Sequence, residues 1–204
     1  MIDIIDTIIF DLGGVLIDWN PERLYKKIFE DEQERHYFLK EVCSPAWNAE
    51  QDAGRPLEEA TQILLDQFPD YGAEIRAYYD RWTEMLGGTI EGTVKILEHL
   101  HNLKMHKLFA LTNWSGETFP YALKNFHFLQ LFEGILVSGD EKVKKPDPKI
   151  YELMLERFKI IPQNAVFIDD SMKNVEAAKN LNINAIHFHS PVQLRQDLES
   201  FGIL

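Results

Sequence analysis

The stretch IIDTIIFDLGGVL, residues 4–16, joins an apolar β-branched run to an acid and two glycines. Residues 4–10 predict a strand that is buried on both faces, as in the middle of a parallel sheet, because most of their side chains are apolar. Asp11 follows at the carboxyl end of this strand, where open α/β sheets bind ligands. Gly13 and Gly14 allow a tight turn and a close approach of a ligand to the backbone. Taken alone, the pattern also describes an ordinary turn at the end of a strand.

From Glu91 onward the sequence alternates between helical and strand-like segments. Strands are expected at residues 107–111, 135–138, 165–168 and 185–188, and helices at residues 91–103, 116–126, 147–158, 172–181 and after Pro191. This alternation is typical of parallel strands that are joined by right-handed helical crossovers. The sequence therefore predicts an α/β fold, a Rossmann-like parallel sheet with helices on both faces.

Residues 19–87 have a helical period and show no convincing strand. Helices are expected to start near Asn20, Ser44 and Pro56, because capping residues and prolines favour the first turn. An apolar stripe at helical spacing in residues 71–86 indicates the core of a helix bundle rather than ligand contacts. We therefore predict two units: a Rossmann-like core from residues 1–18 and 88–204, and an inserted all-helical cap subdomain from residues 19–87.

The composition is that of a globular protein, with 45% apolar and 26% charged residues in a chain of 204. A net charge of −12 would repel a phosphate backbone, so nucleic acid is not an expected partner. The apolar runs are too short to cross a bilayer, and Asp3 and Asp6 are unlike a signal peptide, so no membrane association is expected. The single cysteine, Cys43, excludes an internal disulfide and fits a cytoplasmic protein.

Polar side chains also follow the next two predicted strands. In LTNWS, residues 111–115, Thr112 and Asn113 would either cap the following helix or donate hydrogen bonds to phosphate oxygens. In KVKKPDP, residues 142–148, we expect Lys144 to be solvated. Lys145, beside a proline, is either part of a turn that starts a helix or a point charge against a phosphate.

The strand expected at residues 165–168 is followed by Asp169 and Asp170. Two adjacent acids repel each other unless a cation lies between them, and oxygen ligands favour Mg²⁺ over zinc. Helix capping by Asp170 or Ser171 would explain only one of the two acids. The sequence therefore predicts a carboxylate, a hydroxyl, an ammonium and a carboxylate pair along one edge of the sheet.

These motifs, in this order, resemble those of the haloacid dehalogenase-like hydrolase superfamily, most closely its phosphatases with a helical cap inserted after the first strand. FDLGGV, residues 10–15, resembles the first motif, whose leading aspartate, here Asp11, is the nucleophile. Three further segments are similar to the remaining motifs: LTN at 111–113; KP at 145–146 with Pro148 and Tyr151; and IDDS at 168–171 with Asn174 and EAA at 176–178. The similarity spans essentially the whole chain.

The resemblance implies a Mg²⁺-dependent phosphatase that hydrolyses a small phosphorylated metabolite through an aspartyl-phosphate intermediate. Asp11 would attack phosphorus. Three groups would hold the transferring phosphoryl oxygens: Thr112, Asn113 and Lys145. Oxygen atoms at the same edge would hold the metal: Asp11, the backbone carbonyl of Gly13 and Asp170, with Asp169 close by.

Gly13 departs from the usual pattern, because phosphatases of this family generally carry a second aspartate there as general acid and base. Sugar-1-phosphatases of the superfamily that read Asp-Leu-Gly at this site also exist, so a sugar-1-phosphate is an expected kind of substrate. True haloacid dehalogenases lack this acid too, which keeps a metal-free 2-haloacid dehalogenase as an alternative, although the pair Asp169 and Asp170 argues against it. A non-catalytic binding or regulatory module of the same fold is the other alternative.

The inserted helices are expected to close over the site and exclude water. Hinges are expected near residues 17–19 and at residues 87–88, where glycines absorb backbone rotation. Four residues about a turn apart on one cap helix are candidates for substrate specificity, although their spacing also describes a solvated helix face: Trp47, Asn48, Gln51 and Asp52.

Overall fold

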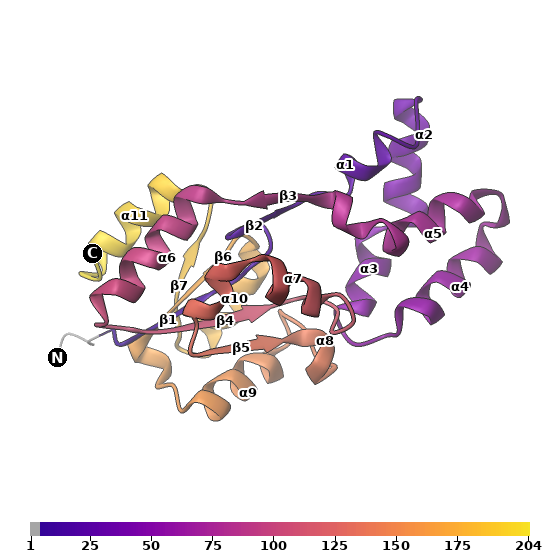
Figure 1. The fold of residues 1–204 in the computed structure, drawn as a ribbon. Helices are drawn as coiled ribbons and strands as arrows, with labels where there is room; N and C mark the ends of the chain where they lie inside the picture. Colours follow the sequence, from indigo (N-terminus) through magenta and orange to yellow (C-terminus); the bar gives the residue numbers. More distant parts are fainter. Residues whose placement is uncertain (1–4) are drawn as a thin grey trace.

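The computed structural model describes residues 5–204, and its larger part is built on a parallel sheet (Figure 1). The strand order is β5-β4-β1-β6-β7, and every hydrogen-bonded pair in it is parallel. The strands are β1 (Thr7–Phe10), β4 (Lys107–Thr112), β5 (Gly134–Val137), β6 (Ala165–Asp169) and β7 (Asn184–His187). The predicted α/β class is confirmed, while Ile4, the predicted start of the first strand, lies outside the described residues.

Strand β1 lies in the middle of the sheet, which explains why its sequence is apolar on both faces. Ile8 and Phe10 belong to the hydrophobic core on one face, and Ile9 belongs to the core on the other. Three helices contribute to the first core: α6 (Glu91–Leu103), α7 (Phe119–Asn125) and α11 (Pro191–Ser200). Two contribute to the second: α9 (Pro148–Phe158) and α10 (Met172–Asn180). The sheet is therefore covered on both faces, as predicted.

Helix α7 begins later than the predicted residue 116. The amide groups of Thr118 and Phe119 both bond to the carbonyl of Ser115, at 3.2 and 3.1 Å, and this turn occupies the residues before the helix. Shorter helical pieces follow strands or precede them: α8 (Ser138–Glu141) and 3₁₀ turns at His127–Leu131 and Pro162–Asn164.

The chain between residues 20 and 85 is helical and has a hydrophobic core of its own. Its elements are α1 (Glu22–Tyr25), α2 (Glu32–Tyr37), a π-helix (Phe38–Val42), α3 (Pro45–Gln51), α4 (Leu57–Gln67), α5 (Gly72–Asp80) and 3₁₀ turns at Pro69–Tyr71 and Trp82–Met85. Leu24, Tyr25, Phe38 and Ile75 are fully buried in this third core. The separate core supports our proposal that residues 19–87 are a cap on a core of residues 1–18 and 88–204.

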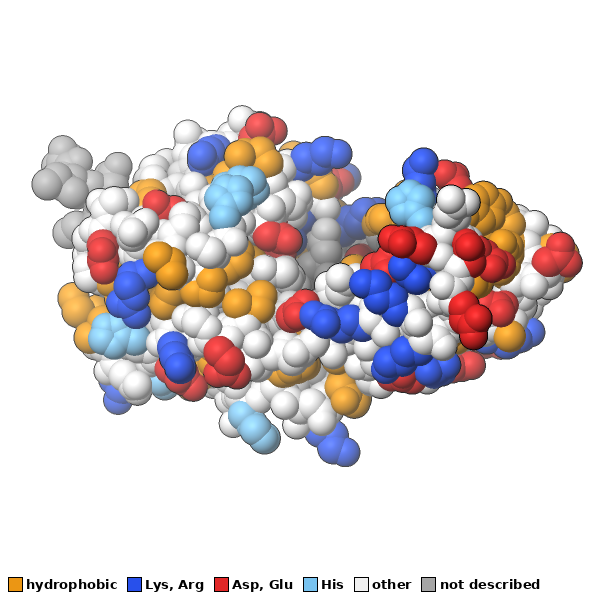
Figure 2. Space-filling view, turned by 90° about the horizontal axis from the view of Figure 1, so that it is seen from above, with side chains coloured by type: hydrophobic (Ala, Val, Ile, Leu, Met, Phe, Trp, Pro, Cys, Tyr) orange, Lys and Arg blue, Asp and Glu red, His pale blue; other side chains and the backbone are white. Residues whose placement is uncertain are grey.

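Figure 1 shows these helices beyond the carboxyl ends of β4 and β5, at one end of the sheet. Seen from above, the molecule narrows between the larger lobe of the sheet and the smaller lobe of the helices (Figure 2). None of the helices among the described residues is long and apolar enough to cross a membrane.

The two connections between the lobes pair with each other, which corrects the expectation that residues 19–87 contain no strand. β2 (Ile17–Trp19) and β3 (Leu86–Thr89) are antiparallel, with Ile17 opposite Thr89 and Asp18 opposite Gly88. The expected hinges therefore form a two-stranded link. The sequence did not indicate it because β3 contains two glycines, which weaken the strand pattern, and because its partner is distant in the chain.

Replacing Ile9 by alanine is expected to lower the free energy of unfolding by about 2–5 kcal/mol, because it removes a fully buried side chain from the central strand. Val192→Ala is the control, since Val192 is 70% exposed and its loss should change stability by less than about 0.5 kcal/mol. Urea denaturation of both variants measures the difference. Equal small effects would contradict the central position of β1.

Candidate active site

The carboxyl ends of the central strands bring the predicted polar residues to one edge of the sheet. Asp11 continues β1, and its amide donates to the carbonyl of Ile168 in β6 at 2.8 Å. Thr112 is the last residue of β4, and Asp169 is the last residue of β6. Because both strands pair with β1 in parallel register, all three side chains are held on the same side of the molecule.

Lys145 lies at the centre of this edge, in the loop that follows α8. Its Nζ is 2.9 Å from Asp11 Oδ1 and 2.7 Å from Asp169 Oδ2, and it donates to the carbonyl of Leu111 at 2.8 Å. The Lys145 side chain is 0% exposed. A buried ammonium is stable only when it is paired and hydrogen-bonded, and these three oxygens meet that requirement.

Asn113 positions Lys145, a role that the sequence did not indicate. Its side-chain amide donates to the Lys145 carbonyl at 3.0 Å and accepts from the Lys145 amide at 2.8 Å. One amide hydrogen of Asn113 is left for a ligand, because the NH₂ group carries two. The expected direct contact of Asn113 with phosphate is therefore at most secondary to its bonds with the lysine backbone.

The hydroxyl of Thr112 is buried and has no hydrogen-bond partner among the described residues. Buried hydroxyls in folded proteins are almost always hydrogen-bonded, so an unpaired one at a strand end indicates a place for a ligand. This supports the predicted use of Thr112 as a donor to an anionic substrate.

The two adjacent acids have different environments. Asp169 is fully buried, and its carboxylate accepts from Lys145, from the amide of Ser171 at 2.8 Å and from Asn174 Nδ2 at 3.0 and 3.1 Å. Asp170 is exposed and borders the cavity described below. The cation that compensates Asp169 is thus Lys145, and Asp170 is the acid available to a metal ion.

Burial and neighbouring carboxylates shift the pKa values of the acids at this edge upward. Burial raises the pKa of Asp11, Lys145 opposes the rise, and the nearby carboxylate of Asp169 adds to it. Burial and the carboxylate of Asp169 raise the pKa of Asp170 as well. Burial alone would lower the pKa of Lys145, but Asp11 and Asp169 outweigh it and keep the pKa above its ordinary value. The site therefore has more negative charge than one ammonium compensates.

The donor atoms fit a small hard cation. One carboxylate oxygen each from Asp11, Asp169 and Asp170 lies within 4.8 Å of the others. Beside Gly13, the backbone of Ile17 bonds to the carbonyl of Leu12 and to the amide of Gly14. These two hydrogen bonds do not use the Gly13 carbonyl, which was predicted to bind the metal. An all-oxygen donor set of this kind is typical of Mg²⁺.

The two glycines of the first motif differ in the space around them. A Cβ on Gly14 would overlap the carboxylate of Asp170, and Gly14 has a φ of +74°, so a glycine is required there. A Cβ on Gly13 would meet no atom within 4 Å. The position at which the family resemblance led us to expect an acid is thus open space in this protein.

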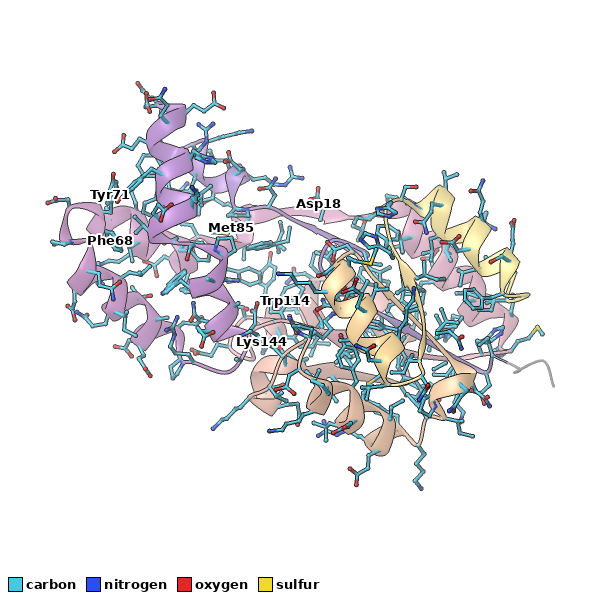
Figure 3. All side chains as sticks on the ribbon, turned by 180° about the vertical axis from the view of Figure 1, so that it is seen from behind. Asp18, Phe68, Tyr71, Met85, Trp114 and Lys144 are labelled. Carbon is cyan, nitrogen blue, oxygen red and sulfur yellow. The ribbon has the colours of Figure 1, made fainter. Side chains whose placement is uncertain are left out.

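A cavity of about 410 Å³ lies above this edge, between the sheet and the cap helices. The sheet side contributes Asp11, Gly13, Gly14, Asn113, Trp114, Ser115, Thr118 and Asp170. The cap side, including its link, contributes Trp19, Asn48, Asp52, Tyr78, Tyr79, Trp82 and Met85. Figure 3 shows Trp114 and Met85 facing each other across the junction of the two lobes. Part of the stripe in residues 71–86 therefore lines a cavity, which corrects its assignment to the helix core alone.

The four candidate specificity residues divide into two pairs, and neither pair forms a solvated face. Trp47 and Gln51 are buried in the cap: Trp47 Nε1 donates to the carbonyl of Ala60 at 3.1 Å, and Gln51 Nε2 donates to the Tyr79 hydroxyl at 2.8 Å. Asn48 and Asp52 line the cavity. Helical spacing alone could not show which side of α3 faces the sheet.

Three polar contacts fasten the cap to the sheet. Ser138 Oγ donates to the backbone carbonyl of Asp52, and the Leu57 amide donates to Glu117 at 2.8 Å. Lys144 Nζ pairs with Glu50 at 3.1 Å; the two side chains are 28% and 54% exposed, so Lys144 is partly solvated, as expected, and also forms an ion pair to the cap. These contacts hold the helical lobe against the loops at the carboxyl end of the sheet.

The chain is similar to known hydrolases over most of its length. The family model for haloacid dehalogenase-like hydrolases matches residues 8–188. A sesquiterpene phosphatase of Aspergillus oryzae is 27% identical over 88% of this chain and 87% of its own length. A phosphorylated carbohydrates phosphatase of Thermotoga maritima is also 27% identical, over 89% of this chain and 84% of its own. The crystal structure of a haloacid dehalogenase family enzyme of Bacteroides thetaiotaomicron, a magnesium complex, has a TM-score of 0.72 at 22% identity, over 91% of this chain and 94% of that one.

The free energy of unfolding of the metal-free protein is expected to fall as pH rises from about 4 to about 8. The folded-state pKa of Asp11 is raised from 3.8 to about 8, so in this interval the folded protein holds a proton that the unfolded chain releases. Stability is thus present at low pH and lost as Asp11 ionises, and Mg²⁺ should oppose the loss by binding the ionised form.

Thermal unfolding followed by circular dichroism, with EDTA or Mg²⁺ across this pH range, checks the expectation. Asp11→Asn is the matched control because it removes the titrating proton with little change of shape. Identical pH dependence of both proteins in EDTA would show that Asp11 has an ordinary pKa.

Proposed function

Since this chain belongs to the haloacid dehalogenase-like hydrolase family, we propose that it is a Mg²⁺-dependent phosphatase that hydrolyses a small phosphorylated metabolite through an aspartyl-phosphate on Asp11. The observation that carries the proposal is the buried arrangement of Asp11, Lys145 and Thr112 at the carboxyl edge of the sheet, where Asp11 borders the cavity. It combines a carboxylate, a fixed ammonium and an unpaired hydroxyl, which are the groups that phosphoryl transfer requires.

Asp11 is oriented for nucleophilic attack. Its Oδ1 accepts from the amide of Leu12 at 2.7 Å and pairs with Lys145, which leaves Oδ2 free for phosphorus. The P–O bond to the substrate alcohol breaks as the bond to Asp11 forms, and water then hydrolyses the acyl phosphate. The covalent step divides one difficult displacement into two easier ones.

Lys145 and Thr112 would hold the phosphoryl oxygens, with Asn113 and Asp169 fixing Lys145 in place. The ammonium is rigid because three oxygens of the protein hold it, so little reorganisation is needed when negative charge develops on the phosphoryl group. The hydroxyl of Thr112 would gain from the substrate the partner that it lacks in the protein.

Asp11, Asp170 and the Gly13 carbonyl would hold Mg²⁺, with Asp169 close by. A bound Mg²⁺ neutralises the repulsion between an anionic nucleophile and an anionic substrate. Three carboxylate groups beside one ammonium support this assignment, because a cation would balance the remaining negative charge.

The same observations weigh against the two alternatives. A 2-haloacid dehalogenase needs no metal, so Asp170, the carboxylate of this cluster that does not pair with Lys145, would be unexplained in it. A binding or regulatory module would not need a buried lysine directed at a carboxylate nucleophile. The phosphatases among the relatives also favour a phosphomonoester.

A sugar phosphate, such as a sugar-1-phosphate, is our proposal for the substrate class. Gly13 provides no proton donor, which favours alcohols of low basicity, and an anomeric hydroxyl is more acidic than a primary one. The cavity walls include the aromatic rings of Tyr79, Trp82 and Trp114, whose faces suit the apolar side of a sugar ring or of an aryl group. The carbohydrate phosphatase of Thermotoga maritima supports this class.

Phosphate release is expected to require both Mg²⁺ and Asp11. A screen of phosphorylated metabolites should give activity that EDTA abolishes and Mg²⁺ restores, and Asp11→Asn should reduce kcat to background because the amide is not a nucleophile. Circular dichroism verifies that the variant is folded. Chloride release from 2-haloacids, unaffected by EDTA, would instead support the dehalogenase.

Lys145→Met is expected to lower kcat/KM by at least about 10²-fold, as is typical for the loss of a donor that stabilises developing charge. Lys144→Ala should lower it by less than about 5-fold, because Lys144 pairs only with Glu50 at the rim of the cap. Steady-state kinetics of the two variants on one substrate measure the contrast. Equal effects would remove Lys145 from the proposed mechanism.

A further inference from the structure

The proposed reaction includes two proton transfers, one to the leaving alcohol and one from the attacking water. The sheet side has no acid at the position of Gly13 to carry them out. The departing alkoxide must be protonated, and the water that hydrolyses the aspartyl-phosphate must lose a proton. Gly13 has no side chain, and the space beside it is open. Asp169 is fully engaged in hydrogen bonds, and Asp11 and Asp170 are assigned to attack and to the metal.

Asp52 places a carboxyl group in the same cavity from the opposite side. It follows α3 in the cap and lines the cavity together with Asp11 and Gly13. Its backbone carbonyl accepts from Ser138 Oγ, and Ser138 Oγ in turn accepts from the Trp114 amide at 3.0 Å. A chain of hydrogen bonds therefore fixes the Asp52 backbone to the edge of the sheet that carries the nucleophile.

The Asp52 carboxyl group is free to exchange protons. No hydrogen bond or ion pair engages it within residues 5–204, although other charged groups of the cap rim are paired. Burial raises the pKa of Asp52 to about 7, and Lys144 and Lys145 oppose the rise. Near neutral pH both the acid and the carboxylate are thus well populated, which is the condition for a group that must give and then take a proton.

The titratable groups around Asp52 are compatible with this behaviour. Tyr78 and Tyr79 face it from α5, and burial raises both of their pKa values, so they stay neutral. The ammonium groups of Lys144 and Lys145 face it from the loop after α8. The other carboxyl groups lining the cavity are Asp11 and Asp170 at its floor.

We propose that Asp52 is the general acid and base of this enzyme, supplied by the cap in place of a carboxylate at Gly13. The inference rests on the proposed phosphatase function and adds a catalytic residue to it. It makes proton transfer dependent on cap closure, because Asp52 reaches the cavity only from the cap side.

The two steps balance as follows. Asp11 Oδ2 bonds to phosphorus, the bond from phosphorus to the alcohol oxygen breaks, and the Asp52 carboxyl proton passes to that oxygen, so that the alcohol leaves neutral. In the second step the Asp52 carboxylate takes a proton from water as the water oxygen bonds to phosphorus. The bond from phosphorus to Asp11 breaks, which releases inorganic phosphate and returns both aspartates to their starting forms.

The test is a series of leaving groups with Asp52→Asn, using glycerol phosphate, glucose 6-phosphate, glucose 1-phosphate and 4-nitrophenyl phosphate. With the two primary alkyl phosphates kcat/KM should fall by about 10²–10⁴-fold, the usual contribution of a general acid. With 4-nitrophenyl phosphate, whose leaving oxygen needs no proton, it should fall by less than about 5-fold. Wild-type activity on the alkyl phosphates should also decline above about pH 7, and this decline should be absent in the variant.

Asn48→Ala is the matched control, because Asn48 lines the same cavity one turn earlier on α3 and carries no titratable proton. Its effect should be the same for every leaving group. Asp52→Ala is the second acid-free variant, which should reproduce the dependence on the leaving group if Asp52→Asn folds poorly.

Two further measurements test the role directly. Gly13→Asp introduced into Asp52→Asn should restore activity on alkyl phosphates at least about 10-fold, since a side chain at Gly13 meets no atom within 4 Å of its Cβ. After mixing with 4-nitrophenyl phosphate, intact mass spectrometry should show phosphorylated Asp52→Asn protein accumulating, because the base for the second step is missing.

A failure of the proposed phosphatase function can be distinguished from a failure of the role proposed for Asp52. If the wild-type protein releases no phosphate in Mg²⁺, the proposed function is wrong. If it is active but Asp52→Asn loses the same factor with every leaving group, as Asn48→Ala does, Asp52 only contacts the substrate and the inference is overturned while the phosphatase function stands.

Discussion

The buried ammonium of Lys145 is the constraint on which the rest of the site depends. A lysine with no exposed side-chain surface is tolerated only because Asp11, Asp169 and a backbone carbonyl surround it. Asn113 then fixes the lysine backbone, and Asn174 and the Ser171 amide complete the shell of Asp169. The result is a rigid positive point next to a carboxylate whose second oxygen is free, and this preorganisation is what a transferring phosphoryl group needs.

The cap completes the site from the other side, and this divides the chemistry between two separately packed parts of the chain. In the proposed mechanism the sheet provides the nucleophile, the ammonium and the acids for a metal, whereas the cap provides aromatic walls and the carboxyl group of Asp52. The paired strands β2 and β3 are the covalent links between the two parts.

Under our proposal, Asp52 supplies from the cap the carboxyl group that Gly13 does not provide on the sheet side. The glycine leaves space that a side chain would otherwise occupy, and the cavity extends over it toward the cap. If Asp52 acts as proposed, the acid is in place only when the cap covers the cavity, so proton transfer and exclusion of water would coincide.

The sequence by itself determined the α/β class, the helical character of the insertion and the position of the polar residues at strand ends, because hydrophobic period and strand-end position are local properties. Only the tertiary structure decided that β2 pairs with β3, that Trp47 and Gln51 are buried while Asp52 faces the cavity, and that Lys144 bonds to Glu50. Each of these depends on the rotation of a helix or on a partner far away in the chain. The spacing of residues along a helix shows which side chains share a face. It does not show how the helix is rotated in the fold or which distant residues that face contacts.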